Sequence, residues 1–133
     1  MGAWGFKVFE NDDAADFLAE FEQEGIVALS RALNEVCESV YIEAPEGSVA
    51  LAAAAIVAAA SGNQGLLPDE AEAALKSVNS WQAIAGLKGK ARRAVDCVGG
   101  STSELMELWN DAAPDDRAGF RTEMESLQDA LRR

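Results

Sequence analysis

The stretch Val49-Ala50-Leu51-Ala52-Ala53-Ala54-Ala55-Ile56-Val57-Ala58-Ala59-Ala60 decides the fold of this chain. Alanine and leucine are strong helix formers, and the stretch offers no polar face to water. A helix that is apolar all round must be surrounded by other elements, so we expect it at the centre of a bundle. Its start follows a break at Ala44-Pro45, because the residue before a proline is pushed out of helical geometry, and Ser61-Gly62 ends it.

Helix signals recur on both sides of this stretch. Apolar residues at three-to-four spacing, with capping residues or prolines before them, predict further helices over 12–24, 26–40, 68–76, 81–98, 105–109 and 114–133. Asn11 is placed to cap the first, and Ser101-Thr102-Ser103-Glu104 has the pattern of a capping box. Outside residues 4–9, no segment has a pattern that predicts a β-strand. The pattern therefore predicts an all-α fold, a single domain over 1–133 with six or seven helices in a bundle.

Several side chains are expected in the core of that bundle. The helix over 26–40 has one apolar stripe, and the two later tryptophans stand at core spacing in their helices. The residues concerned are Leu29, Leu33, Val36, Cys37, Val40, Trp81 and Trp109. Cys37 and Cys97 are expected to be reduced, buried, small apolar side chains, because a secreted domain stapled by disulfides is smaller and richer in cysteine.

The residue counts exclude many chemistries. The chain of 133 residues has no histidine, which removes Ser-His and Cys-His nucleophilic sites, imidazole zinc sites and the commonest general base. No phosphate-binding or dinucleotide-binding glycine motif is present. We therefore expect no enzyme, no catalytic residues and no cofactor. The longest apolar run, residues 48–60, is too short to cross a hydrocarbon core of ~30 Å, and without a basic leader at the start we expect a cytoplasmic protein.

The net charge of −12 is unevenly distributed. Residues 1–75 contain 14 acidic residues and only Lys7 and Arg31 as bases, whereas residues 76–133 are neutral overall. An acidic surface repels nucleic acid and attracts basic proteins. The only dense basic cluster, Lys88, Lys90, Arg92 and Arg93, is expected to meet the acidic half or to stay in water.

The candidate partner-binding residues are Asp16, Glu20, Glu24 and Trp4. The three carboxylates fall on the outer face of the first predicted helix. Trp4, with Phe6 and Phe9, belongs to an aromatic opening segment that either tucks into the bundle, as we expect, or presents its rings to a partner. Carboxylates at i,i+4 spacing on the same helix could hold Mg²⁺ or Ca²⁺, but neither an EF-hand loop nor a Glu-x-x-His pattern accompanies them, so we expect no metal site.

The opening Gly2-Ala3-Trp4-Gly5-Phe6, followed by Phe9-Glu10-Asn11-Asp12, resembles the start of a family of small bacterial proteins known as domain of unknown function 4259. Its members typically begin with a glycine, a small residue and Trp-Gly, and continue with Phe-(Glu/Asp)-Asn-Asp into an acidic helix. The alanine-rich stretch and residues 103–109 are also similar to later segments of that family. The resemblance implies a bacterial, cytoplasmic protein and brings no activity, cofactor or site residue.

Three kinds of function remain. The charge favours a protein-binding domain, most concretely an immunity-like or antitoxin-like inhibitor that covers the nucleic-acid site of a basic toxin with carboxylates. The alternatives are an interaction or structural protein of unknown role and, less favoured, a carboxylate-based metal-binding module.

Overall fold

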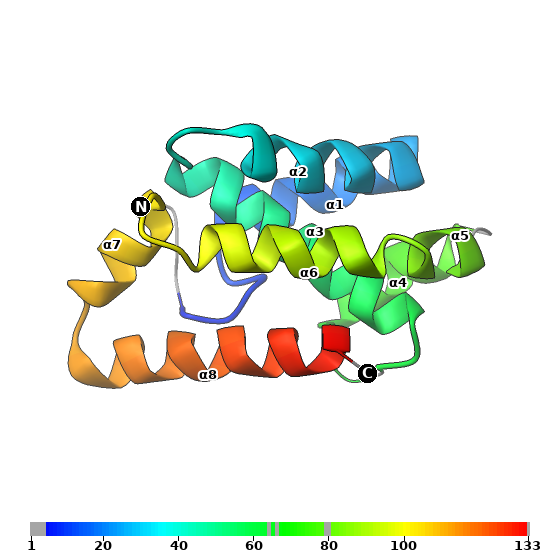
Figure 1. Cartoon of the computed structure of the whole chain (residues 1–133). Helices are drawn as coiled ribbons and strands as arrows, with labels where there is room; N and C mark the ends of the chain where they lie inside the picture. The colour runs from blue at the N-terminus through cyan, green and yellow to red at the C-terminus, as the bar shows by residue number, and fades with distance from the viewer. Residues whose placement is uncertain (1–4, 64, 66, 79–80, 133) are drawn as a thin grey trace.

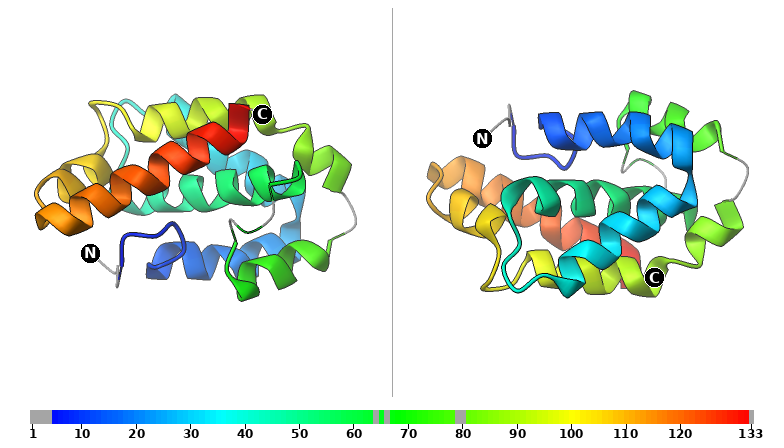
Figure 2. Two further views of the ribbon diagram at one scale, coloured as in Figure 1. Left: turned by 90° about the horizontal axis from the view of Figure 1, so that it is seen from below. Right: turned by 90° about the horizontal axis from the view of Figure 1, so that it is seen from above.

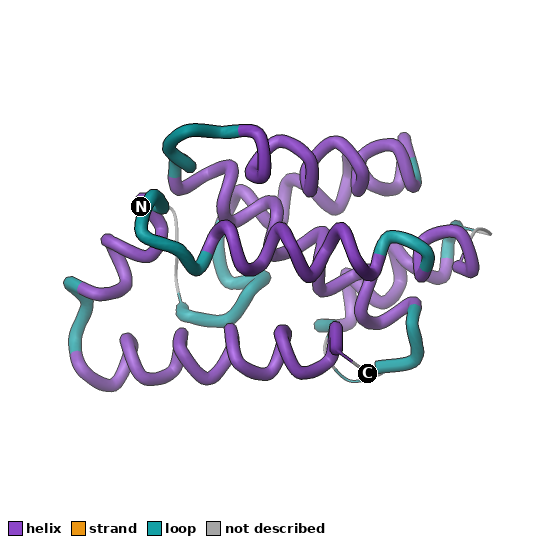
Figure 3. Tube along the Cα trace, viewed as in Figure 1, coloured by secondary structure: helices purple, strands orange, loops and turns teal. Residues whose placement is uncertain are grey.

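The computed structural model describes residues 5–63, 65, 67–78 and 81–132. Within these ranges the fold is all-α, as predicted, and Figure 3 shows helices joined by loops without a strand. Eight helices follow one another along the described chain (Figure 1): α1 (Asp12–Glu24), α2 (Ile26–Glu38), α3 (Ala44–Ala60), α4 (Asp69–Lys76), α5 (Trp81–Ala85), α6 (Lys88–Val98), α7 (Glu104–Asn110) and α8 (Pro114–Arg132).

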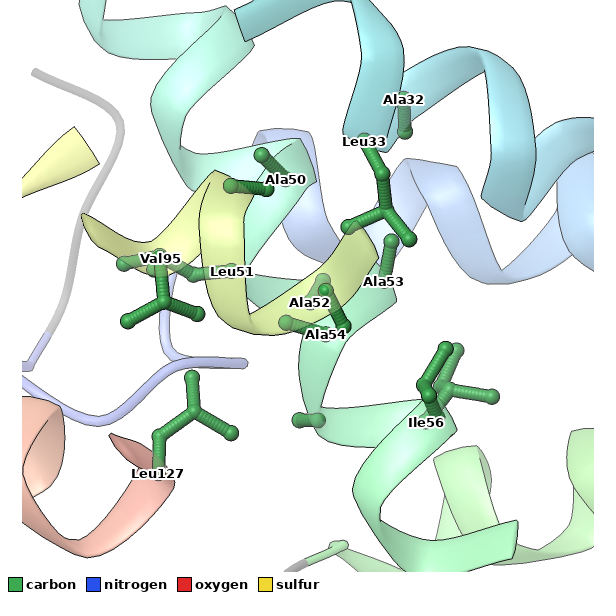
Figure 4. Packing of buried hydrophobic residues seen from close by; sticks show 14 of the residues in the cluster. Ala32, Leu33, Ala50, Leu51, Ala52, Ala53, Ala54, Ile56, Val95 and Leu127 are labelled. Carbon is green, nitrogen blue, oxygen red and sulfur yellow. The ribbon is translucent and has the colours of Figure 1, made fainter. Parts of the chain in front are cut away.

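The alanine-rich helix α3 is the centre of the bundle, which confirms its predicted position. It contacts all seven other helices, and in Figure 2 it runs between α1 on one side and α6 and α8 on the other. Ala52, Ala53 and Ala54 have no exposed surface. Their small side chains leave room for larger residues from the surrounding helices, among them Leu33 of α2, Val95 of α6 and Leu127 of α8 (Figure 4). Close packing of this kind stabilises the fold by dispersion and by apolar burial.

The predicted start of the central helix and the predicted single helix over 81–98 are wrong for identifiable reasons. The central helix begins at Ala44 and includes Pro45, because the first helical turn needs no N–H from a proline. The predicted helix over 81–98 is two helices, α5 and α6, with a turn at Gly86-Leu87 between them. That division accounts for eight helices where six or seven were expected.

A hydrogen-bonded clasp joins the loop after α2 to the start of α7, and we call these contacts the interhelix clasp. Ile42 N–H donates to the Thr102 carbonyl at 2.8 Å, and Glu104 N–H donates to the Ile42 carbonyl at 2.9 Å. The Glu104 carboxylate accepts from Ala44 N–H at 2.7 Å, so it caps α3 instead of its own helix. The predicted capping box is therefore wrong: Ser103 is the residue that caps α7, accepting from the backbone N–H of Met106.

Tyr41 closes the clasp and gives it a measurable signature. Its hydroxyl donates to Glu107 Oε2 at 2.6 Å, and this hydrogen bond to a carboxylate raises the pKa of Tyr41 to about 12. Since Tyr41 is the only tyrosine, a phenolate absorbance titration reports it alone. We expect a midpoint near pH 12 in the native protein and near 10 in Glu107→Gln. The raised pKa means that this contribution to stability is complete at neutral pH and lost as the pH rises through about 12. A native midpoint of about 10 would contradict the clasp.

Four residues predicted in the core are exposed or only half-buried. Val40 is 91% exposed, because α2 ends at Glu38 before the apolar stripe does. Cys37 is exposed and Cys97 is only half-buried, so the expectation that both are buried is wrong. Trp81 is also exposed, at the start of the short helix α5, and its indole N–H donates to the Leu75 carbonyl at 2.9 Å.

Four other residues expected in the core are buried. Leu29, Leu33 and Val36 are buried in α2. Trp109 is buried as predicted and stacks on Phe120, with ring centroids 5.1 Å apart.

The opening segment packs on the bundle. Residues 5–10 form turns and bends, and Phe6 and Phe9 are half-buried against the core. Gly119 of α8 makes room for the Phe6 ring, because a Cβ at this position would lie 2.6 Å from a Phe6 ring carbon. The tucked position is therefore confirmed for these two rings, while Trp4 lies outside the described residues. Within the described part of the chain, no helix has the length and apolar character needed to cross a membrane.

Candidate functional site

A groove of about 940 Å³ lies between the opening segment, α1, α8 and the chain leading into α4. We call it the acidic groove. Figure 2 shows the opening segment beside the start of α1. The floor of the acidic groove is apolar and is made by side chains from five segments that are distant in sequence. These residues are Val8, Phe9, Leu18, Ala55, Leu67 and Leu127.

Carboxylates form the rim of the acidic groove. Glu10, Glu22, Glu70 and Glu123 line it together with one base, Lys7. Glu10 accepts from the Lys7 backbone N–H at 3.2 Å, and Glu123 accepts from the Val8 N–H at 3.3 Å, so these two carboxylates also hold the opening segment in place. Glu22 and Glu70 are exposed at the surface of the groove. The rim is therefore strongly negative above an apolar floor.

Asn11 connects the opening segment to α1. Its side-chain oxygen accepts from Ala14 N–H at 2.8 Å, which caps the helix as predicted. Its side-chain nitrogen donates to the Val8 carbonyl at 3.1 Å. One residue thus begins the helix and also fixes the backbone that places Val8 and Phe9 in the groove floor.

The predicted partner-binding carboxylates are at the surface but outside the acidic groove. Glu20 and Glu24 both bind Arg31 of α2, and the Glu24 pair measures 2.9 Å. The hydrogen bond from Arg31 lowers the pKa of Glu24, and the two carboxylates raise the pKa of Arg31. Because Arg31 compensates part of their charge, these two residues present less free negative charge than the sequence indicates.

Asp16 and Trp4 complete the predicted set. Asp16 is exposed on α1 and forms no ion pair with another described residue. It lies on the outer face of the helix, as predicted, but does not line the groove. Trp4 lies outside the described residues. The structure therefore brings Glu20 and Glu24 together around Arg31 and leaves Asp16 apart from them.

The groove residues were missed because their signals are spread along the chain. Ala15, Leu18 and Ala19 extend the apolar face of α1 beyond its buried residues Ala14, Phe17 and Phe21, and that excess width is the one local signal for a groove. Glu123 belongs to the half of the chain that is neutral overall, so counting charge cannot select it.

The basic cluster of α6 stays on the surface, one of the two outcomes expected for it. Arg92 and Arg93 are exposed, and Lys90 donates to the Ser30 hydroxyl of α2 at 3.4 Å. The ion pairs found among the described residues involve Arg31, Lys76 and Arg132 and none of the cluster.

The i,i+4 carboxylates of α1 do not form a cation site with their neighbours. In the part of the chain that the structure describes, no group of three or more Asp, Glu or Cys side chains is arranged to hold a metal ion. Glu20 and Glu24 instead hold the guanidinium of Arg31.

These features define a small, acidic, all-helical domain with an apolar groove bordered by carboxylates. A family model described as "Domain of unknown function (DUF4259)" matches residues 2–121. The chain therefore belongs to this family, in agreement with the resemblance of its opening segment. No curated protein and no solved structure matches the chain.

Proposed function

We propose that this protein is a protein-binding domain of the bacterial cytoplasm whose acidic groove receives a basic segment of a partner, and that it acts as an inhibitor of the immunity or antitoxin type. The observation that carries the proposal is the combination of an apolar floor with a rim of carboxylates. Lysine and arginine side chains pair an apolar stem with a charged end, and this combination matches the groove.

The size of the groove supports the proposal. A volume of about 940 Å³ is at the upper end of the usual range for ligand pockets, so it can accept several side chains of a partner. Because Glu22 and Glu70 are exposed, they can pair with a partner's bases without first being released from a buried contact. Burial of the apolar stems on Leu18 and Leu127 supplies the rest of the affinity.

The charge of the whole chain supports the same kind of partner. With −12 arising from residues 1–75, the surface attracts basic proteins over a distance set by the Debye length, ~8 Å at physiological ionic strength. A nuclease that acts on nucleic acid has a basic face of this kind. A protein that covers that face with carboxylates prevents the nucleic acid from binding, which is the chemistry of an inhibitor.

A peptide titration tests whether the groove is the binding surface. The probe is a short synthetic peptide of alternating lysine and leucine residues, and the readout is the backbone amide spectrum of the labelled protein. We expect the largest chemical-shift changes at Ala15, Ala19 and Leu67, which line the groove. Changes centred on the exposed pair Asp115 and Asp116 of α8 would show that the peptide follows charge alone.

A second experiment separates an inhibitor from a scaffold. The native complex is purified from the bacterium, and the partner is assayed for cleavage of nucleic acid with and without this protein. We expect the partner to be a basic protein that loses its activity at a one-to-one ratio. A partner that is acidic, or that keeps full activity in the complex, would favour an interaction or structural role instead.

A further inference from the structure

Cys37 and Cys97 meet on the surface of the protein, far from each other in sequence. They are 60 positions apart, yet the Cys97 thiol donates to the Cys37 sulfur at 3.6 Å. Cys37 is exposed near the end of α2, and Cys97 is half-buried near the end of α6. An oxidant in solution therefore has access to one thiol, and the second thiol is in contact with the first.

The two helices are packed so that this contact is held in register. α2 and α6 pack against each other, and Lys90 of α6 donates to Ser30 of α2 at 3.4 Å. The contact Ser30–Lys90 and the contact Cys37–Cys97 have the same sequence separation of 60 residues, so the helices run parallel in one register. The interhelix clasp, which begins at Tyr41 and Ile42, joins the segments that follow both helices. The two sulfurs thus lie between the Ser30–Lys90 contact and the interhelix clasp, which together hold the two helices in position.

We propose that Cys37 and Cys97 form a reversible redox site in which hydrogen peroxide converts the two thiols into a disulfide between α2 and α6. In the first step the Cys37 thiolate attacks one peroxide oxygen, the O–O bond breaks, and Cys37 becomes a sulfenic acid while the other oxygen leaves as water. In the second step the Cys97 sulfur attacks the Cys37 sulfur, and the hydroxyl leaves as a second water. The two thiols lose two electrons and two protons, which reduce one peroxide to two waters.

The surroundings of Cys37 set the rate of the first step. Contact with α6 removes water from its sulfur and, together with the neighbouring Cys97, raises the pKa of Cys37 to about 11; Arg93 of α6 lowers this pKa and Glu38 of α2 raises it. Because the thiolate is the reactive form, oxidation is slow at pH 7 and becomes about tenfold faster for each pH unit up to the pKa. In a reducing cytoplasm both cysteines therefore stay as free thiols, and the disulfide forms only when peroxide remains present for long enough.

The disulfide is also expected to stabilise the protein. It would close a long loop of the unfolded chain and join two helices that are already in contact. We expect the melting temperature of the oxidised protein to rise by on the order of 10 °C. None of the residues that line the acidic groove belongs to α2 or α6, so this inference is independent of the proposed function.

Mass spectrometry of the peroxide-treated protein tests the proposal. We expect the intact monomer to lose about 2 Da, both free thiols to disappear, and a reducing agent to restore the original mass and melting temperature. The matched controls Cys37→Ser and Cys97→Ser retain one thiol each, so they should instead gain oxygen or form dimers and show no rise in melting temperature. Addition of oxygen to both native cysteines without loss of mass, native dimers linked through cysteine, or an oxidised protein that melts lower than the reduced one would overturn the proposal.

Discussion

Ala54→Glu is expected to unfold the protein under conditions in which the native chain is fully folded. Ala54 has no exposed surface and lies in the part of α3 that the other helices surround. A carboxylate at this position would be buried without a partner, and its longer side chain would also crowd the core. The combined cost of about 5 kcal/mol or more equals much of the free energy of unfolding of a typical domain. Ile56→Asp, at a second site with no exposed surface, is expected to have the same effect.

Thermal melting followed by circular dichroism measures this effect, and two variants control for its cause. Ala118→Glu adds the same carboxylate at an exposed alanine of α8 and should melt within a few degrees of the native protein. Ala54→Leu adds volume without charge and should cost about 1–3 kcal/mol. If Ala54→Glu melted as high as Ala118→Glu, α3 could not be the buried centre of the fold.

Deletion of residues 1–9 is expected to lower the free energy of unfolding by about 3 kcal/mol. The deletion removes Phe6 and Phe9, which are half-buried against the core, and the hydrogen bond between Val8 and Glu123. Asn11 remains, so the cap of α1 is preserved and the loss is attributable to the opening segment. Removing Val8 and Phe9 also takes away part of the floor of the acidic groove, so we expect peptide binding to be lost with the stability.

Urea unfolding measures the effect of the deletion. The substitution Lys7→Ala, at an exposed position of the same segment, serves as the control and should change the free energy of unfolding by less than about 0.5 kcal/mol. A deleted chain with full stability and no peptide binding would show instead that the opening segment is an exposed recognition arm.

The parts of the fold that were predictable depend on local pattern. No side chain between Val49 and Ala60 is polar, and this alone requires the helix to be buried. Asn11 marks the start of α1 because its side-chain oxygen can cap a helix. The errors arise at the ends of helices and at residues whose burial depends on how neighbouring helices pack. Val40 continues an apolar stripe, but its helix has already ended at Glu38. Cys37 lies on an apolar stripe, and Cys97 was expected to be a buried, small apolar side chain. Only the packing of α2 on α6 shows that the two meet at the surface.

The candidate site was less predictable than the fold, because it depends on contacts between distant residues. The sequence places Glu20 and Glu24 on one face of α1, but their pairing with Arg31 follows from how α2 packs on α1. The floor of the acidic groove joins Leu18 to Ala55 and Leu127, and no local pattern connects these three positions. The acidic character of the first half can be counted from the sequence, whereas the groove that carboxylates border could be found only in the structure.

The measurement that tests the central claim most directly is the Kd of the lysine-leucine peptide for two variants with the same net charge. Glu22→Lys with Glu70→Lys reverses two charges on the rim, and Glu35→Lys with Asp96→Lys reverses two exposed charges on α2 and α6, which do not line the groove. If the acidic groove binds basic segments, the rim variant should weaken binding about tenfold, and the control should weaken it less than about twofold. Equal weakening by both variants would mean that only the overall charge attracts the peptide, and it would contradict the groove as the binding site.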